Sequence, residues 1–350
     1  MKRVSRLNEY LQNILLGAGA VTLFFFSLEF ALRPLTAHGI VKSYSPMMTQ
    51  LERGTEDWRL AHITADEFRE PDPILFWRPI ASSPYTSQRF KGPKVTIPKP
   101  KGVYRIICYG DSNTDGPPVG SWPEILQKIL NRNSGQRGGE YEVLNAGVAG
   151  YSSHQGLMRF RQDAEVYQPD LIFVSFGWND LALTRGAPDK HFRPPHWALV
   201  GLERVFLKYH FYRVFKYYLG LIMKPSYSSA NLGPRVSLED YPENLKGFLE
   251  TARAHSVSVV FLTRPYHMNR LRGTEDMIIP WWVANLPLYN GKLLRFAKSN
   301  GAVAVDIQKI FETRYLDLFS DECHFNLEGR RRMAEILSEK IDYFTRGLSS

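Results

Sequence analysis

A serine stands in a short polar stretch that directly follows an apolar run. Residues 103–108 read VYRIIC and residues 109–116 read YGDSNTDG, with Ser112 near the middle. One interpretation is a simple turn, because Gly, Asp, Ser and Asn favour turn conformations. The other is a serine nucleophile, because α/β proteins place their functional groups at the carboxyl ends of parallel strands. The stretch alone leaves both interpretations open.

Three more polar clusters lie farther along the chain. NAGVAGYSS (145–153) and FGWND (176–180) each follow an apolar run, and DECHFNLEG (321–329) precedes a helical pattern. Together with GDSNTDG (110–116), these blocks resemble, in order and spacing, the four signature blocks of the SGNH, or GDSL-type, serine hydrolase superfamily. The resemblance covers about residues 103–346. It implies an α/β fold of the flavodoxin-like type, a three-layer α/β/α sandwich around a five-stranded parallel sheet.

The residue types in these blocks suit a Ser-His-Asp mechanism. A serine hydroxyl is a weak nucleophile until an imidazole can take its proton, and the imidazole needs an acceptor that fixes its tautomer. We therefore expect Ser112 to attack an ester carbonyl, His324 to act as general base and then acid, and Asp321 to orient His324. The Asp-x-x-His spacing lets both side chains come from one turn between a loop and a helix.

The resemblance also implies which groups stabilise the negatively charged oxygen of the tetrahedral intermediate. These are the backbone N–H groups of Ser112 and Gly150 and the side-chain amide of Asn179, with Gly150 preferred to Gly147. Donors aimed at such a charge typically contribute a few kcal/mol each.

Three residues beside these groups are candidate substrate contacts, namely Trp178, Asn113 and Tyr151; for Trp178 the alternative is core packing. Asp111 and Asp180 are expected to be structural. Cys323 lies beside His324 but is expected to be an unreactive thiol, because no second signal makes it a nucleophile.

Composition narrows the cofactors and partners. The two cysteines exclude a disulfide scaffold, and no Cys/His spacing resembles a zinc site, so we expect no metal or organic cofactor. The net charge is +9, without a long Lys/Arg run, which argues against a nucleic-acid partner. The expected partner is an acylated carbohydrate or lipid substrate.

Strands and helices that alternate along the chain must place the four blocks together. Near-continuous apolar runs separated by amphipathic segments are typical of a parallel sheet that is covered on both faces. The expected strands lie within residues 103–110, 141–148, 170–177, 257–265 and 302–307, and the expected helices within 121–133, 152–167, 236–256 and 281–301, with a closing helix from about Asn326. That closing helix is expected to bury one stripe of Leu327, Met333, Ile336, Leu337 and Ile341.

The amino terminus carries an apolar stretch from Ile14 to Leu32 that is interrupted only by Glu29. Its length suits a helix that spans a bilayer. Lys2, Arg3 and Arg6 precede it, which favours a cytoplasmic amino terminus. A cleaved signal peptide and a buried core helix are the alternatives.

The expected organisation therefore has four parts. Residues 1–12 form a cytoplasmic terminus, 13–33 a single-pass transmembrane anchor, 34–102 an irregular approach segment rich in Pro and aromatic residues, and 103–350 an extracytoplasmic hydrolase domain.

That domain contains an insertion at about residues 185–235. Five basic residues and one acidic residue are interleaved with aromatic residues in its 201–224 stretch. The insertion is expected to be helical and either to cap Ser112 or to rest on a bilayer, and the alternative is a crossover helix packed on the sheet.

The sequence thus predicts a membrane-anchored serine esterase that acts on acyl or acetyl esters. Since one fold supports many reactions, two other functions stay open. One is an O-acyltransferase that acts on an envelope or extracellular polysaccharide, and the other is a non-catalytic assembly or binding protein that keeps the fold.

Overall fold

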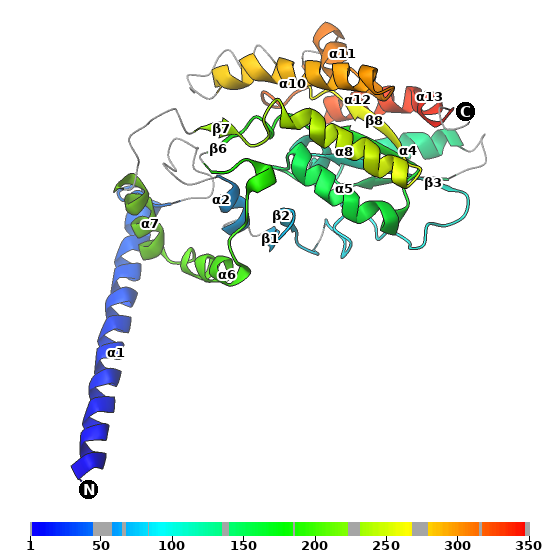
Figure 1. The fold of residues 1–350 in the computed structure, drawn as a ribbon. Coiled ribbons are helices and arrows are strands. Elements are labelled where there is room, and N and C mark those ends of the chain that lie inside the picture. Colours follow the sequence, from blue (N-terminus) through cyan, green and yellow to red (C-terminus); the bar gives the residue numbers. More distant parts are fainter. Residues whose placement is uncertain are drawn as a thin grey trace. The chain divides into compact units, whose positions relative to one another are not determined.

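The computed structural model describes residues 2–44, 58–64, 68–82, 84–134, 140–184, 186–222, 232–267, 279–314 and 317–346. The chain divides into two compact units. Met1–Glu67 and Pro194–Asn231 form the first unit, and Phe68–Arg193 and Leu232–Ser350 form the second. Figure 1 shows the elements of both units in chain order.

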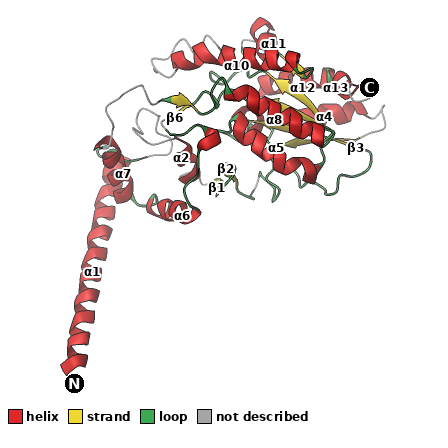
Figure 2. Cartoon of the chain, viewed as in Figure 1, coloured by secondary structure: helices red, strands yellow, loops and turns green. Residues whose placement is uncertain are grey.

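A five-stranded parallel sheet forms the middle of the second unit (Figure 2). The strand order is β4-β3-β5-β8-β9, so the first strand of the sheet in the chain lies inside it and the second lies at an edge. Their bounds are Val103–Gly110 (β3), Glu140–Asn145 (β4), Leu171–Ser175 (β5), Ser258–Leu262 (β8) and Val303–Val305 (β9). This confirms the predicted five-stranded parallel sheet, and the order is that of a doubly wound fold of the flavodoxin-like type. In the register of the sheet, Gly110 lies opposite Ser175 and Cys108 lies opposite Asn145. The first three polar blocks therefore begin at the same end of the sheet, where the strands have their carboxyl ends.

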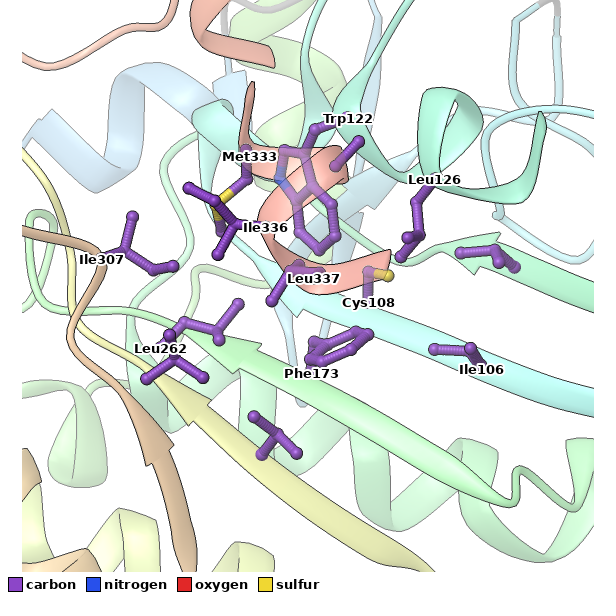
Figure 3. Close-up of a cluster of buried hydrophobic side chains, with 14 of the residues drawn as sticks. Ile106, Cys108, Trp122, Leu126, Phe173, Leu262, Ile307, Met333, Ile336 and Leu337 are labelled. Carbon is purple, nitrogen blue, oxygen red and sulfur yellow. The ribbon is translucent and has the colours of Figure 1, made fainter. Parts of the chain in front are cut away.

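Helices cover both faces of this sheet, because alternate residues of a strand point to opposite sides. On one face, Ile106 and Cys108 of β3 belong to a buried cluster with Trp122 and Leu126 of α4 (Trp122–Ser134) and Leu337 of α12 (Leu327–Glu339) (Figure 3). On the other face, the ring of Tyr109 lies 5.4 Å from that of Phe160 in α5 (Ser153–Tyr167) and 6.4 Å from that of Phe248 in α8 (Asp240–Ala254). These contacts form the predicted three layers.

The helices of the second unit include those predicted within 121–133, 152–167, 236–256 and 281–301, together with α3 (Ser112–Asp115) and α11 (Ile307–Arg314), which the sequence did not predict. They are α3 (Ser112–Asp115), α4 (Trp122–Ser134), α5 (Ser153–Tyr167), α8 (Asp240–Ala254), α10 (Ile279–Ser299), α11 (Ile307–Arg314), α12 (Leu327–Glu339) and α13 (Ile341–Arg346), with a 3-10 turn η1 (Asp189–His191). The predicted closing helix is in fact two helices, α12 and α13. Met333, Ile336, Leu337 and Ile341 are buried as expected, but Leu327 is 47% exposed, because it opens α12 beside the N-cap residue Asn326.

The segment predicted to be irregular contains regular structure. A short antiparallel hairpin joins β1 (Arg69–Asp72) to β2 (Phe76–Pro79), and α2 spans Trp58–Thr64. Trp77 is fully buried, and its ring lies 5.8 Å from that of Tyr151. The hairpin therefore packs directly against the second polar block. A second two-stranded pair, β6 (Leu183–Thr184) with β7 (Gly233–Pro234), closes the base of the insertion.

The first unit contains α1 (Lys2–Ala37), α2, α6 (Trp197–Phe206) and α7 (His210–Ile222). Within α1, Tyr10–Ala37 is long and apolar enough to cross a membrane; its most apolar window has a mean hydropathy of 1.9, and only 6% of that window is buried. The helix is therefore not the buried core helix of the alternative interpretation. Within the first unit, α7 packs against α1 and α6 packs against α2. Residues 223–231 of the predicted insertion lie outside the described residues.

Candidate active site

Ser112 is the first residue of α3, the short helix that begins where β3 ends. The Asp111 carboxylate caps this helix by accepting a hydrogen bond from the backbone N–H of Asn113 at 3.0 Å. Ser112 Oγ lies 2.8 Å from His324 Nε2. Among the described residues, the backbone N–H of Ser112 has no acceptor, as is usual for the first turn of a helix.

His324 and Asp321 come from one turn just before α12. His324 Nδ1 lies 2.7 Å from Asp321 Oδ2, and Asp321 Oδ1 accepts hydrogen bonds from the backbone N–H groups of Cys323 and His324. Partial burial acts to raise the pKa of Asp321, but these hydrogen bonds outweigh it, and the pKa lies well below its usual range. The carboxylate is therefore ionised at neutral pH.

These distances fix the roles of the two imidazole nitrogens. An ionised Asp321 can only accept a hydrogen bond, so it favours the tautomer with the proton on Nδ1. Nε2 then carries the lone pair and can accept the proton of the Ser112 hydroxyl. The three residues that the sequence singled out thus form a continuous hydrogen-bonded relay.

The second polar block passes beside the Ser112 turn. Gly147 packs so closely against this turn that a Cβ atom would lie 2.2 Å from the backbone nitrogen of Asp115, and its own N–H donates to Asn145 Oδ1 at 2.9 Å. Gly150, by contrast, has a φ of 85°, and its N–H has no acceptor among the described residues. Of the two glycines, only Gly150 has an N–H available to a ligand.

Asn179 and Asp180 join the third block to the second. Asn179 Nδ2 donates to the backbone carbonyl of Tyr151 at 3.2 Å, which uses one of its two amide hydrogens. Asp180 is fully buried and accepts hydrogen bonds from the Ser153 backbone N–H, at 3.0 Å, and from the Ser153 hydroxyl. Burial raises the pKa of Asp180 to about 7. The structural role that the sequence predicted for Asp180 agrees with these contacts.

A buried ion pair between Arg235 and Asp189 holds the loop that contains Gly150. Arg235 Nη1 donates to the carbonyl of Gly150 at 2.7 Å, and Arg235 Nη2 lies 2.8 Å from Asp189 Oδ2, with both side chains fully buried. Asp189 also accepts a hydrogen bond from the Ser152 hydroxyl at 2.6 Å. Sequence reasoning missed this pair, since Asp189 and Arg235 stand at opposite ends of the insertion and no motif links them.

A second buried ion pair joins the Ser112 turn to the His324 turn. Arg264 Nε lies 2.9 Å from Asp111 Oδ2, and Arg264 Nη1 donates to the carbonyl of Cys323 at 3.2 Å. Both charged side chains are almost completely buried. Arg264 follows β8, so the rule that found Ser112, a polar residue at the carboxyl end of a strand, could also have found Arg264.

Two of the three predicted substrate contacts disagree with the structure. Asn113 is buried, its Nδ2 donates to the carbonyl of Cys323, and its Oδ1 accepts the N–H of Phe325. Tyr151 is buried, and its hydroxyl donates to the carbonyl of Trp77 at 2.6 Å. The polar atoms of both side chains are therefore used in hydrogen bonds within the protein. Trp178 is half-buried, and its contact with substrate stays a prediction.

The ligand atoms of Asp321, Cys323 and His324 lie within 4.8 Å of one another, a separation at which three side chains could hold a metal ion. Burial raises the pKa of the Cys323 thiol well above its ordinary value, which keeps it protonated and a poor metal ligand. The Nδ1 atom of His324 is already bonded to Asp321. These contacts suit the hydrogen-bonded relay of Ser112, His324 and Asp321 better than a metal centre.

Comparison with known proteins gives a family match. Residues 108–332 match the GDSL-like Lipase/Acylhydrolase family. The uncharacterized lipoprotein YqeF of Bacillus subtilis (strain 168) is 25% identical over 166 residues, 47% of this chain and 49% of the relative. An arylesterase of Vibrio mimicus is 32% identical over 89 residues, 25% of this chain and 42% of the relative. The chain thus spans less than half the length of the curated relatives it matches.

Among solved structures, a lipase/acylhydrolase from Enterococcus faecalis is similar at 17% identity and a TM-score of 0.44. The match covers 68% of this chain and 95% of that one.

Proposed function

Because the chain belongs to the GDSL-like lipase/acylhydrolase family, we propose that it is a serine esterase that hydrolyses acyl or acetyl esters of a carbohydrate or lipid. The observation that carries the proposal is the relay from Ser112 Oγ to His324 Nε2, at 2.8 Å, and from His324 Nδ1 to Asp321 Oδ2, at 2.7 Å. The arylesterase relative supports the same reaction class.

In the proposed mechanism, Ser112 Oγ attacks the ester carbonyl carbon while its proton passes to His324 Nε2. The oxyanion accepts hydrogen bonds from the N–H groups of Ser112 and Gly150 and from Asn179 Nδ2. The C–O bond to the alcohol then breaks, and the alcohol leaves with the proton from His324. Water attacks the acyl-enzyme with His324 as base, and the acid product and free Ser112 result.

Two observations favour hydrolysis over the other functions left open by the sequence. The side chains of His324 and Asp321 are each 43% exposed, so water can reach the acyl-enzyme, which favours hydrolysis over acyl transfer. The relay has all its hydrogen bonds in place, which favours a catalytic protein over a non-catalytic binding protein. An acylated carbohydrate or lipid therefore remains the proposed substrate class.

We further propose that α1 is a single-pass anchor and that the hydrolase unit lies outside the cytoplasm. The apolar Tyr10–Ala37 stretch has 28 residues, more than the roughly 20 that a spanning helix needs. Lys2, Arg3 and Arg6 precede the stretch. One curated relative is named a lipoprotein, and this name supports an envelope location.

The test of the esterase proposal uses the detergent-solubilised full chain and p-nitrophenyl acetate. Ser112→Ala is expected to lower kcat by at least about a thousandfold, because the nucleophile is lost. Ser299→Ala, at an exposed position of α10, is the control and should leave kcat unchanged. A fluorophosphonate should label the parent and Ser299→Ala but not Ser112→Ala. A folded parent that neither hydrolyses the ester nor takes the label would refute the proposal.

A further inference from the structure

The solvent-facing side of α7 is entirely apolar or aromatic. Its exposed residues are Phe215, Tyr218, Leu219 and Ile222, and Ile222 is 80% exposed. The spacing of three and four residues places them on one face of the helix. A helix of a water-soluble protein turns such a stripe toward the core.

The same arrangement occurs in α6. Its large exposed residues are Trp197, Leu199, Leu202, Val205 and Phe206, and its other exposed positions are alanine and glycine. No exposed residue of either helix is charged. Contiguous apolar surfaces of this kind mark sites that meet a partner or a lipid phase.

The charged residues of the two helices point into the first unit. Lys216 of α7 lies 2.7 Å from Glu203 of α6, and Lys216 also lies over the ring of Tyr44 at 4.1 Å. Arg204 donates to the carbonyl of Ile63 at 2.9 Å, and Arg213 donates to the carbonyl of Tyr44 at 2.9 Å. Both helices are therefore inverted relative to a helix of a protein that faces only water, with the Lys216–Glu203 ion pair turned inward and apolar side chains turned outward.

α7 packs against the carboxyl-terminal part of α1 (Figure 1). Glu29 Oε2 accepts the backbone N–H of Phe211 at 3.2 Å, Thr36 Oγ1 lies 2.6 Å from His210 Nδ1, and the rings of Phe25 and Phe211 lie 5.0 Å apart. The apolar stretch of α1 has 28 residues, or about 42 Å at 1.5 Å per residue, while a bilayer core is about 30 Å thick. These contacts therefore hold α7 near the end of the stretch that emerges from the bilayer.

We propose that the outward apolar faces of α6 and α7 dock onto the phospholipid bilayer that α1 spans, with their side chains at the boundary between headgroups and acyl chains. The inference rests on the proposed anchoring of α1. Lipid is the occupant that the structure favours, because the α7 stripe adjoins a helix whose own apolar side chains are exposed. Interfacial helices with Trp, Phe and Leu on one face bury that face about 5–10 Å into the boundary.

The test measures the depth of single nitroxide labels on the full chain in vesicles of phosphatidylcholine and phosphatidylglycerol. Labelled cysteines replace Leu219 in α7, Leu202 in α6, Leu23 in α1 and, as the aqueous control, Lys128 in α4; all four side chains are exposed. The native Cys108 and Cys323 are buried, so the unsubstituted chain gives the labelling background. Thermal unfolding of each variant checks that it is folded.

We expect the ratio of oxygen to nickel-chelate accessibility at Leu219 and Leu202 to exceed that at Lys128 by at least about threefold, because the chelate is excluded from the 5–10 Å boundary layer. Water-like values at both positions with a lipid-like Leu23 would overturn the docking and leave the anchor intact. A water-like Leu23 would overturn both. Low accessibility to both reagents would mean that protein, such as a second copy of the chain, covers the faces, and would also overturn the inference. The measurement uses no turnover, so it is independent of the esterase proposal.

Discussion

The Arg264–Asp111 ion pair leads to a prediction about how the Ser112 turn and the His324 turn are held together. The side chains are 0% and 1% exposed, and Arg264 Nε lies 2.9 Å from Asp111 Oδ2. Arg264→Met keeps the volume of the side chain but leaves the Asp111 carboxylate buried without its cation. Breaking a buried pair in this way costs about 3–5 kcal/mol of the free energy of unfolding, or roughly 6–20 °C in the Tm of a unit of this size.

A double-mutant cycle separates the pair from its surroundings. Asp111→Asn keeps a side-chain oxygen that can still accept the N–H of Asn113, so the cap of α3 survives. In Arg264→Met/Asp111→Asn no buried charge is left unpaired, so the double variant should lose less stability than the two single variants combined, by at least about 1 kcal/mol. Arg253→Met, at an exposed position of α8, is the control and should stay within about 0.5 kcal/mol of the parent.

The assay is urea unfolding of the solubilised full chain, followed by near-ultraviolet circular dichroism, with p-nitrophenyl acetate turnover measured on the folded variants. Because Arg264 Nη1 also holds the carbonyl of Cys323, the residue before His324, kcat should fall in Arg264→Met and recover in part in Arg264→Lys. Single variants that cost less than about 1 kcal/mol and combine additively would refute the account of a coupled buried pair.

Three further predictions concern the loops around the site. Arg235→Met removes the donor that fixes the Gly150 carbonyl, so kcat on p-nitrophenyl acetate should fall by about tenfold or more with a smaller change in KM; an unchanged kcat would contradict this positioning role. Gly147→Ala forces a Cβ atom against backbone and should lower the free energy of unfolding by about 1–3 kcal/mol in urea melts. Burial raises the pKa of Asp180 to about 7, so the folded state holds its proton more tightly than the unfolded state, and stability should decline as the pH rises from about 4 to 7. Asp180→Asn, which keeps an oxygen for the Ser153 N–H, should flatten that decline in unfolding measured across this pH range.

The sheet and its helices were predictable because their signals are local. Apolar runs such as 103–110 and 170–177 correspond to β3 and β5, and each polar block follows where its strand ends. The relay of Ser112, His324 and Asp321 could also be predicted from the sequence, since Asp321 and His324 lie within one turn and Ser112 follows the first strand. The proximity of Ser112 and His324 came from the order of the blocks and not from either block by itself.

The errors arose where the deciding contact is distant in sequence. Asn113 and Tyr151 are polar residues beside the proposed nucleophile, Ser112, and the proposed oxyanion glycine, Gly150, and so resemble substrate contacts. Their partners, the carbonyls of Cys323 and Trp77, lie 210 and 74 residues away. The Asp189–Arg235 pair was missed for the same reason, because 46 residues separate its members.

Glu29 shows how such a distant contact changes the interpretation of a local pattern. In the sequence it only interrupts the apolar stretch of α1, and a carboxylate there counts against a membrane span. In the structure it is 7% exposed, pairs with Arg33 at 3.2 Å and accepts the N–H of Phe211 in the first turn of α7. A carboxylate at the positive end of a helix is favourably placed, and its cost is offset by both partners. The charge therefore joins α1 to α7, and the residue that interrupts the apolar pattern is the one that links the proposed anchor to the face proposed to meet lipid.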